Sequence, residues 1–197
     1  MGYPGIVFIL NGGGERYGKR VAWNSKSGDA DVAFEAVSPG EYTLSALGEQ
    51  DRYIASISCG DVNLLRDRLM VGGGVAPCSI EAVVRDDFAS VTASLSPEAI
   101  VRMTAAGVKQ SGVFLIPLDN VLQQPAIGTV LLNLGSLQMK VIPGRYLAFV
   151  SEDRNLAWYE PEVQRHLLAS GRVVTLAPGE SHTLILDWLP QLNESGL

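Results

Sequence analysis

The sequence predicts an all-β protein made of two consecutive Ig-like, transthyretin-like β-sandwiches, the first of which lacks its N-terminal strand. Three observations predict this class: short apolar runs bounded by turn residues, a motif that returns 104 residues later, and a composition that leaves little room for long helices. The chain of 197 residues contains 21 Gly and 10 Pro. Frequent Gly and Pro interrupt helices but suit strands joined by tight turns, so we expect layers of short antiparallel strands.

The repeat defines two domains. Residues 37–44, VSPGEYTL, return as residues 141–148, VIPGRYLA, and apolar positions continue in the same register beyond them. In this alignment Leu69 and Val71 fall against Val173 and Thr175. Further on, three alternating apolar positions of the first copy align with three of the second: Ile80, Ala82 and Val84 align with Leu184, Leu186 and Trp188. We expect domains at residues 1–84 and 85–197.

Each expected strand is a short run of apolar and β-forming residues bounded by Gly, Pro, Asn, Asp or Ser. These runs are residues 7–10, 42–47, 80–84, 91–95, 113–116 and 130–132. Only residues 161–169 resemble a helix, because Pro161 stands at the start and Gly171 follows the end. We expect this helix to be a brief excursion between strands.

The repeated Pro-Gly-x-Tyr motif has a structural explanation. Pro39-Gly40 and Pro143-Gly144 predict type II turns, because Pro fixes φ at the first central position and Gly supplies a positive φ at the second. Tyr42 and Tyr146 then stand at the start of a strand. We expect each ring to be buried and each hydroxyl to reach a backbone partner near the rim.

The order of these motifs resembles a known family. The first copy reads PGEYTL, a variable loop, CGDVNLL, RLMV and SIEAVV, and the second reads FLIP, MKVIPGRYLAFV and AWYEPEVQRHLLASGRVVTLAPGESHTLIL. Both resemble the carboxypeptidase regulatory-like domains, also called transthyretin-like or prealbumin-like domains. The resemblance implies Ig-like sandwiches of the kind that occur in tandem in bacterial secreted and cell-surface proteins.

The first copy is shorter than the second. A strand equivalent to residues 91–95 would fall before Met1, and a sandwich without an outer strand exposes unpaired backbone groups along the neighbouring edge. Three explanations are open: the sequence is a fragment of a longer protein, the first copy is a naturally shortened variant, or a strand from another subunit fills the gap, as in strand-addition filaments.

The two cysteines, Cys59 and Cys78, both belong to the first copy. In an antiparallel pairing of adjacent segments they come within reach of a disulfide, and the alternative is two independent buried thiols. We favour the disulfide, which indicates an oxidising, exported setting. No second Cys pair or neighbouring His completes a four-ligand metal site.

Several patterns in the sequence resemble catalytic, phosphate-binding or metal-binding motifs, but none predicts such a site. Residues 13–19 match the spacing G-x-x-x-x-G-K, but Arg20 replaces the required Ser or Thr and a strand follows, which favours a hairpin connection. His166 and His182 stand near carboxylates without the context of a nucleophile. Carboxylates that could bind calcium lack a loop of spaced ligands, and we interpret them as solvated turn residues: Asp29, Asp31, Asp86 and Asp87. We expect no catalytic residue, cofactor or metal.

Exposed aromatic residues are the best candidates for a binding surface. Trp158 and Tyr159 precede the expected helix and could contact a glycan or a protein, and Trp23 lies in an expected strand. The net charge of −6 excludes a broadly basic surface for nucleic acid, and no apolar run is long enough to insert into a membrane.

The function that the sequence favours is non-enzymatic: a structural or adhesive module of an extracellular bacterial protein or self-assembling surface structure. The expected partners are other protein subunits or further domains of the same polypeptide. The alternative is an accessory module of a larger secreted enzyme that binds carbohydrate or protein.

Overall fold

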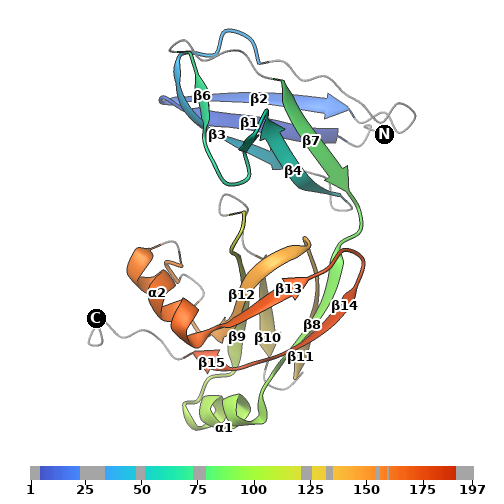
Figure 1. Ribbon diagram of the computed structural model, residues 1–197. Helices are drawn as coiled ribbons and strands as arrows, with labels where there is room; N and C mark the ends of the chain where they lie inside the picture. Colours follow the sequence, from blue (N-terminus) through green and yellow to red (C-terminus); the bar gives the residue numbers. More distant parts are fainter. Residues whose placement is uncertain are drawn as a thin grey trace. The chain divides into compact units, whose positions relative to one another are not determined.

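The computed structural model describes residues 5–22, 34–47, 52–72, 79–120, 126–131, 135–153, 156–158 and 160–189. Within them it consists of strands β1 to β15 and two short helices, arranged in several sheets (Figure 1). The predicted all-β, sandwich-type class is therefore confirmed.

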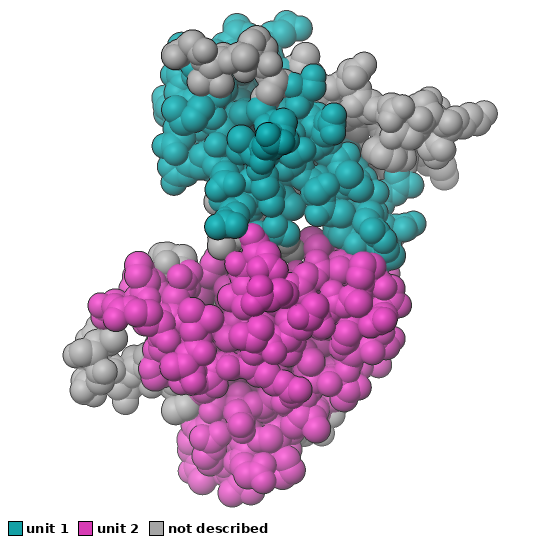
Figure 2. Space-filling view, viewed as in Figure 1, with its two compact units in different colours: residues 1–87, 120–123 teal, residues 88–119, 124–197 magenta. Residues whose placement is uncertain are grey.

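The chain forms two compact units (Figure 2). Unit 1 comprises residues 1–87 and 120–123, and unit 2 comprises residues 88–119 and 124–197. The sequence placed the boundary after residue 84. Unit 1 extends to Asp87, which bonds to Tyr53 and Arg85 of the same unit.

Unit 1 contains two antiparallel sheets. The first has the order β2-β1-β3-β6, and its strands are Glu15–Ala22, Gly5–Gly12, Gly40–Leu47 and Leu69–Val71. The second has the order β5-β4-β7, and its strands are Val62–Asn63, Tyr53–Cys59 and Ile80–Arg85. Apolar side chains of both sheets share one core, including Phe8, Leu10, Tyr42, Leu44 and Ile57.

Unit 2 also contains two sheets. The order of the first is β10-β9-β12-β13, with strands Ala126–Leu131, Gln110–Pro117, Gly144–Ser151 and Arg172–Leu176, and β15, Trp188–Leu189, pairs with β12. The order of the second is β11-β8-β14, with strands Ser136–Val141, Ala89–Leu95 and Ser181–Leu186. Two pairings, β8 with β14 and β12 with β15, are parallel, whereas the sequence predicted antiparallel strands throughout.

Two helices interrupt the strands of unit 2. Helix α2, Pro161–Ser170, lies where the sequence predicted it. Helix α1, Pro97–Ala105, was not predicted, although its start carries a signal: the Ser96 side chain caps the amide of Ala99, and Pro97 and Glu98 occupy the first turn. Ala99 and Met103 of α1 are fully buried in the core between the sheets.

Helix α2 covers a second apolar cluster on the other face of β9 and β12. Phe114 and Phe149 stack with ring centroids 5.0 Å apart, and Ile116, Leu147 and Leu167 complete the buried cluster. Because alternate residues of a strand face opposite sides, β9 and β12 contribute to both cores. This explains why they are apolar almost continuously.

The strand order β2-β1-β3-β6 of unit 1 corresponds to the order β10-β9-β12-β13 of unit 2. However, the number of residues that separates equivalent positions of the two units is not the same along the whole chain. Tyr42 lies opposite Leu69, and Tyr146 lies opposite Val174. Leu69 therefore corresponds to Val174, and the predicted match of Leu69 and Val71 with Val173 and Thr175 is wrong by one residue. A shift of one residue exchanges the two faces of a strand, and accordingly Val173 is half exposed whereas Val174 is buried.

The outer face of the first sheet of unit 1 is more polar than its counterpart in unit 2. Asn11 pairs with Thr43, and Ile9 pairs with Ser45. The corresponding pairs in unit 2 are Ile116 with Leu147 and Phe114 with Phe149, which are wholly apolar and form the cluster that α2 covers. The segment that follows β3 instead forms β4 and β5 in the other sheet.

Strand β4 overturns two expectations. The sequence predicted a variable loop before CGDVNLL, and an open edge where the first copy lacks a strand. The structure has β4 at residues 53–59, paired with β7 over its whole length apart from a bulge between Ile54 and Ser56. That side of β7 is therefore occupied by the chain itself.

Candidate functional site

The repeated Pro-Gly-x-Tyr motif forms the same anchor in both units. The Tyr42 hydroxyl donates to the carbonyl of Ser38 at 2.8 Å, and the Tyr146 hydroxyl donates to the carbonyl of Ile142 at 2.7 Å. Both tyrosines are almost completely buried, and burial raises the pKa of Tyr42. Each hydroxyl closes the turn that precedes its own strand, which is a structural use of the side chain.

The turn differs from the predicted type II geometry. Gly144 has φ +155°, and Gly40 is not among the described glycines with positive φ. Each glycine instead begins its strand and lies against the ring of the tyrosine two residues later, where an added Cβ would lie 3.4 Å from Tyr42 and 3.5 Å from Tyr146. An added Cβ would therefore make ordinary van der Waals contact with either ring, and of the two positions only Gly144 has a φ that L-residues rarely adopt.

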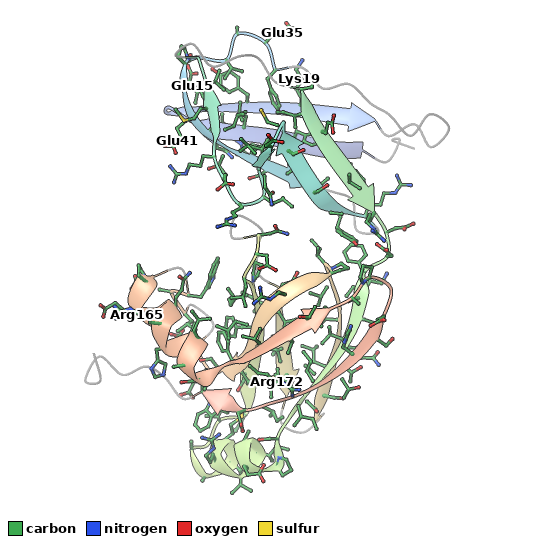
Figure 3. All side chains as sticks on the ribbon, viewed as in Figure 1. Glu15, Lys19, Glu35, Glu41, Arg165 and Arg172 are labelled. Atoms are coloured by element: carbon green, nitrogen blue, oxygen red, sulfur yellow. The ribbon has the colours of Figure 1, made fainter. Side chains whose placement is uncertain are left out.

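A polar cluster surrounds the tyrosine turn of unit 1. The Tyr17 hydroxyl donates to Glu15, and the Ser38 amide donates to the Tyr17 oxygen at 3.3 Å. The hydrogen bond from Tyr17 lowers the pKa of Glu15, and the Tyr17 ring meets the Tyr42 ring edge to face at 6.1 Å. Figure 3 shows Glu15 at the same end of the sheet as Glu41, which pairs with Arg68 at 3.3 Å. Glu15 and Glu41 therefore each have a partner at this end of the sheet, Tyr17 and Arg68 respectively.

The sequence favoured a hairpin connection over residues 13–19, but in the structure β2 already begins at Glu15, and only Gly13 and Gly14 form the connection. Gly13 and Gly14 both have positive φ and connect β1 to β2, which is the geometry of a two-residue hairpin turn. Lys19 lies within β2, opposite Phe8. A strand therefore stands where a phosphate loop requires a helix N-terminus.

The side chains of Tyr53, Arg85 and Asp87 form a cluster in which the pKa of each group is shifted. The Tyr53 hydroxyl donates to Asp87 Oδ1 at 2.7 Å, and Arg85 Nε donates to the same oxygen at 2.8 Å. Burial, followed by the bond to Asp87, raises the pKa of Tyr53 to about 12. The hydrogen bonds from Arg85 and Tyr53 lower the pKa of Asp87. Sequence reasoning considered Asp86 and Asp87 only as turn residues or calcium ligands and missed this contact.

The two histidines lie in different surroundings, and His182 Nε2 is 3.8 Å from Glu180 Oε2. His182 Nε2 accepts a hydrogen bond from the amide of Ala177 at 3.2 Å, so this nitrogen supports the turn before β14. Asp187, which the sequence placed near His182, is bonded to Ser96 at 2.7 Å and lies 3.6 Å from Arg102. His166 is exposed on α2, where Glu162 pairs with Arg165 at 2.8 Å. Arg165 points away from the sheet in Figure 3.

Asp187 organises a network that holds α1, and sequence reasoning did not find it. Arg102 of α1 donates to the carbonyl of Trp188 at 3.3 Å, and its guanidinium lies 5.9 Å from the centroid of the Trp188 ring. The Ser96 hydroxyl that caps α1 also donates to Asp187. The helix is therefore bound to the segment between β14 and β15, a connection of residues far apart in the sequence.

The predicted aromatic contact surface is largely structural in its described part. Trp158 is half-buried and packs against the cluster beneath α2, together with Leu156 and Val163. Tyr159 and Trp23 lie outside the described residues. Trp158 therefore has a clear packing role and presents only part of its surface.

Cys59 is the last residue of β4 and is half-buried. Its register partner across the sheet is Ile80, two residues after Cys78, which lies outside the described residues. The predicted calcium candidates Asp29 and Asp31 also lie outside them. Among the residues that the structure describes, no group of three or more His, Cys, Asp or Glu side chains could hold a metal ion.

Neither described helix has the length and apolar character needed to cross a bilayer. Comparison with models of protein families, with curated proteins and with solved structures gave no match.

Proposed function

We propose that the chain is a non-enzymatic structural module of an extracellular bacterial protein, in which the β-sandwich units act as rigid spacers. The observation that carries the proposal is the duplicated tyrosine anchor. Tyr42 and Tyr146, the most recognisable residues of the repeat, are both buried and both bond to the carbonyl four residues earlier. The resemblance to carboxypeptidase regulatory-like domains supports the extracellular bacterial setting.

The proposal includes a disulfide between Cys59 and Cys78. It is supported by the register, because Cys59 lies opposite Ile80 and two residues of extended chain span at most about 7 Å. It is also supported by the absence of a free cysteine among the described residues. Such a bond would add roughly 3 kcal/mol in the chain-entropy model and would suit an oxidising compartment.

Thiol titration in denaturant tests this part of the proposal. Protein purified without reductant should expose no reactive thiol, whereas reduced protein should expose both cysteines. Two reactive thiols in protein exported to an oxidising compartment would contradict the disulfide and weaken the case for secretion.

The proposed partners are neighbouring domains of the same polypeptide or other protein subunits. Stretching single chains by their ends tests a load-bearing role directly. A spacer should give discrete unfolding steps, one for each unit, because each unit has its own core. Extension without any force peak would contradict the proposal.

The second candidate function is an accessory module that binds carbohydrate or protein, and the observation in its favour is the partly exposed ring of Trp158. Titration with a panel of polysaccharides, followed by tryptophan fluorescence, separates the two candidates. We expect no saturable shift. A shift that is lost in Trp158→Ala and kept in Leu168→Ala, a matched change of an exposed residue on α2, would favour the binding module.

A further inference from the structure

We infer that β4 is a built-in substitute for the strand that opens the repeat: it fills, in unit 1, the place that β8 fills in unit 2. Strand β4 completes the second sheet of unit 1 whatever the function of the protein. It assigns the partner of β7 to a segment of this chain, residues 53–59, and to no second molecule.

The first step is the equivalence of the last strands, β7 and β14. Each follows the short strand that pairs beside the tyrosine strand, and each sends alternate apolar residues into the core of its own unit. In unit 1 these are Ile80, Ala82 and Val84. In unit 2 they are Leu184 and Leu186, and Trp188 of β15 continues the alternation. The spacing of 104 residues in the sequence holds for this strand.

The second step is the neighbour of each last strand. Among the described residues, β14 pairs with β8, and β7 pairs with β4. The strand β4 comes from the segment between β3 and β6, whose counterpart between β12 and β13 contains α2. Thus the same interval of the repeat covers an apolar face in unit 2 and supplies a strand in unit 1.

The third step is the match of side chains within the two places. Ile57 lies opposite Ala82, and Leu95 lies opposite the corresponding residue, Leu186. Ile57 and Leu95 are both buried in the core of their unit. One pair further along, Cys59 faces Ile80 as Ala93 faces Leu184. Apolar side chains therefore occupy the same positions in both places.

The two substitutes run in opposite directions, since β8 is parallel to β14 and β4 is antiparallel to β7. This is compatible with a common place, because the backbone groups of an edge can pair with a strand of either direction. Side chains alternate between the two faces in both cases, so direction does not decide which residues reach the core.

Hydrogen bonds outside the pairing with β7 also hold both ends of β4. At its start, Tyr53 donates to Asp87, just after β7 ends. Near its end, the amide of Leu64 donates to the carbonyl of Ile57 at 2.8 Å, and the Leu64 side chain is completely buried in the same core. Strand β4 is thus held at both ends as well as by its pairing with β7, and this side of β7 offers no place for a donor strand.

Engineered cross-linking of the full chain tests the inference. Ser56 and Val83 are register partners on β4 and β7 and both are exposed, so Ser56→Cys with Val83→Cys should form a disulfide within one chain under mild oxidation. Peptide mapping by mass spectrometry distinguishes this bond from one that involves Cys59 or Cys78. The control is Ser56→Cys with Val84→Cys, because Val84 faces the core and should not cross-link.

A cross-link that joins two chains, or none at all in a chain whose circular dichroism matches the wild type, would overturn the inference. If the cysteine variants fail to fold, hydrogen exchange of the wild type decides instead. Amides of β7 that exchange slowly in monomeric protein support an internal partner, and amides that exchange as fast as those of an unstructured peptide contradict it. Saturable binding of a peptide with the β8 sequence, residues 88–96, that is abolished by the cross-link would also contradict it.

Discussion

The hydroxyl of Tyr53 donates a hydrogen bond to Asp87 Oδ1 at 2.7 Å, and this contact joins the first residue of β4 to the end of the main segment of unit 1. Tyr53 is only 4% exposed, and its hydroxyl bonds to a carboxylate that is itself partly exposed. Arg85, the register partner of Tyr53, bonds to the same carboxylate. The three side chains fix where β7 ends.

Removal of this hydroxyl should destabilise unit 1 and change its response to alkali. We expect Tyr53→Phe to lower the free energy of unfolding by about 1 kcal/mol, the typical contribution of such a hydrogen bond. Because the folded pKa of about 12 exceeds the unfolded value of 10.0, wild-type stability should fall as the pH rises from 10 toward 12. Urea unfolding at several pH values should show a smaller fall in the variant, although Tyr42 still contributes to it. An identical alkaline profile would contradict the assignment.

Replacement of the carboxylate should show the opposite pH dependence. The pKa of Asp87 is lowered in the folded protein, so its contribution to stability is present above the unfolded value, about 4, and is lost as the pH falls through the folded pKa. Asp87→Asn should therefore be less stable than the wild type at pH 7 and equal to it in strong acid. Asp86→Asn, a change of the exposed neighbouring carboxylate, is the control. The effect should shrink in high salt, because the groups are partly exposed.

The tyrosine anchors should respond alike in the two units. Tyr146→Phe removes a buried hydroxyl that bonds to Ile142, and we expect a loss of about 1 kcal/mol in the unfolding of unit 2. Tyr42→Phe should destabilise unit 1 in the same direction. Amide hydrogen exchange, read separately for the strands of each unit, would assign each loss. A variant that destabilises neither unit would show that the hydroxyl is not an anchor.

Neighbouring leucines on α2 allow a matched test of the second apolar cluster. Leu167 is buried against Phe114 and Phe149, whereas Leu168 is 52% exposed. We expect Leu167→Ala to cost about 2–3 kcal/mol and Leu168→Ala to change stability by less than about 0.5 kcal/mol. Tryptophan fluorescence during urea unfolding should report the loss, because Trp158 packs on the same cluster. Equal effects of the two changes would contradict the packing of α2 against the sheet.

The six apolar runs that the sequence marks as strands coincide with β1, β3, β7, β8, β9 and β10. The apolar runs at residues 7–10, 42–47 and 80–84 lie within β1, β3 and β7, and Pro161 marks the start of α2. The missed helix α1 is also a local feature, because Ser96 and Pro97 form a recognisable start and Ala99 and Met103 are spaced by one turn. These residues are therefore sufficient to indicate a helix that begins after Ser96.

The place of β4 could not be predicted from its own residues. An apolar stretch such as residues 53–57 indicates a strand, but its sheet depends on which surfaces elsewhere need cover. In unit 1 the outer face beside β3 carries Asn11 and Thr43, which lie at least ten residues before β4 in the sequence and become neighbours only when β1 pairs with β3. The contacts of Asp87 and Asp187 escaped prediction for the same reason, because their partners, Tyr53 and Ser96, are distant in the chain.

The contrast between the outer faces of the two four-stranded sheets restricts how the copies can be recombined. A chimera in which residues 152–171 replace residues 48–63 would bring Leu167 and Val163 to a surface that offers Asn11, Thr43 and Ser45, and it would also remove β4, the partner of β7. The reverse chimera would uncover Phe114 and Phe149. The segments that follow β3 and β12 are therefore not interchangeable, even though the tyrosine turns of the two units match.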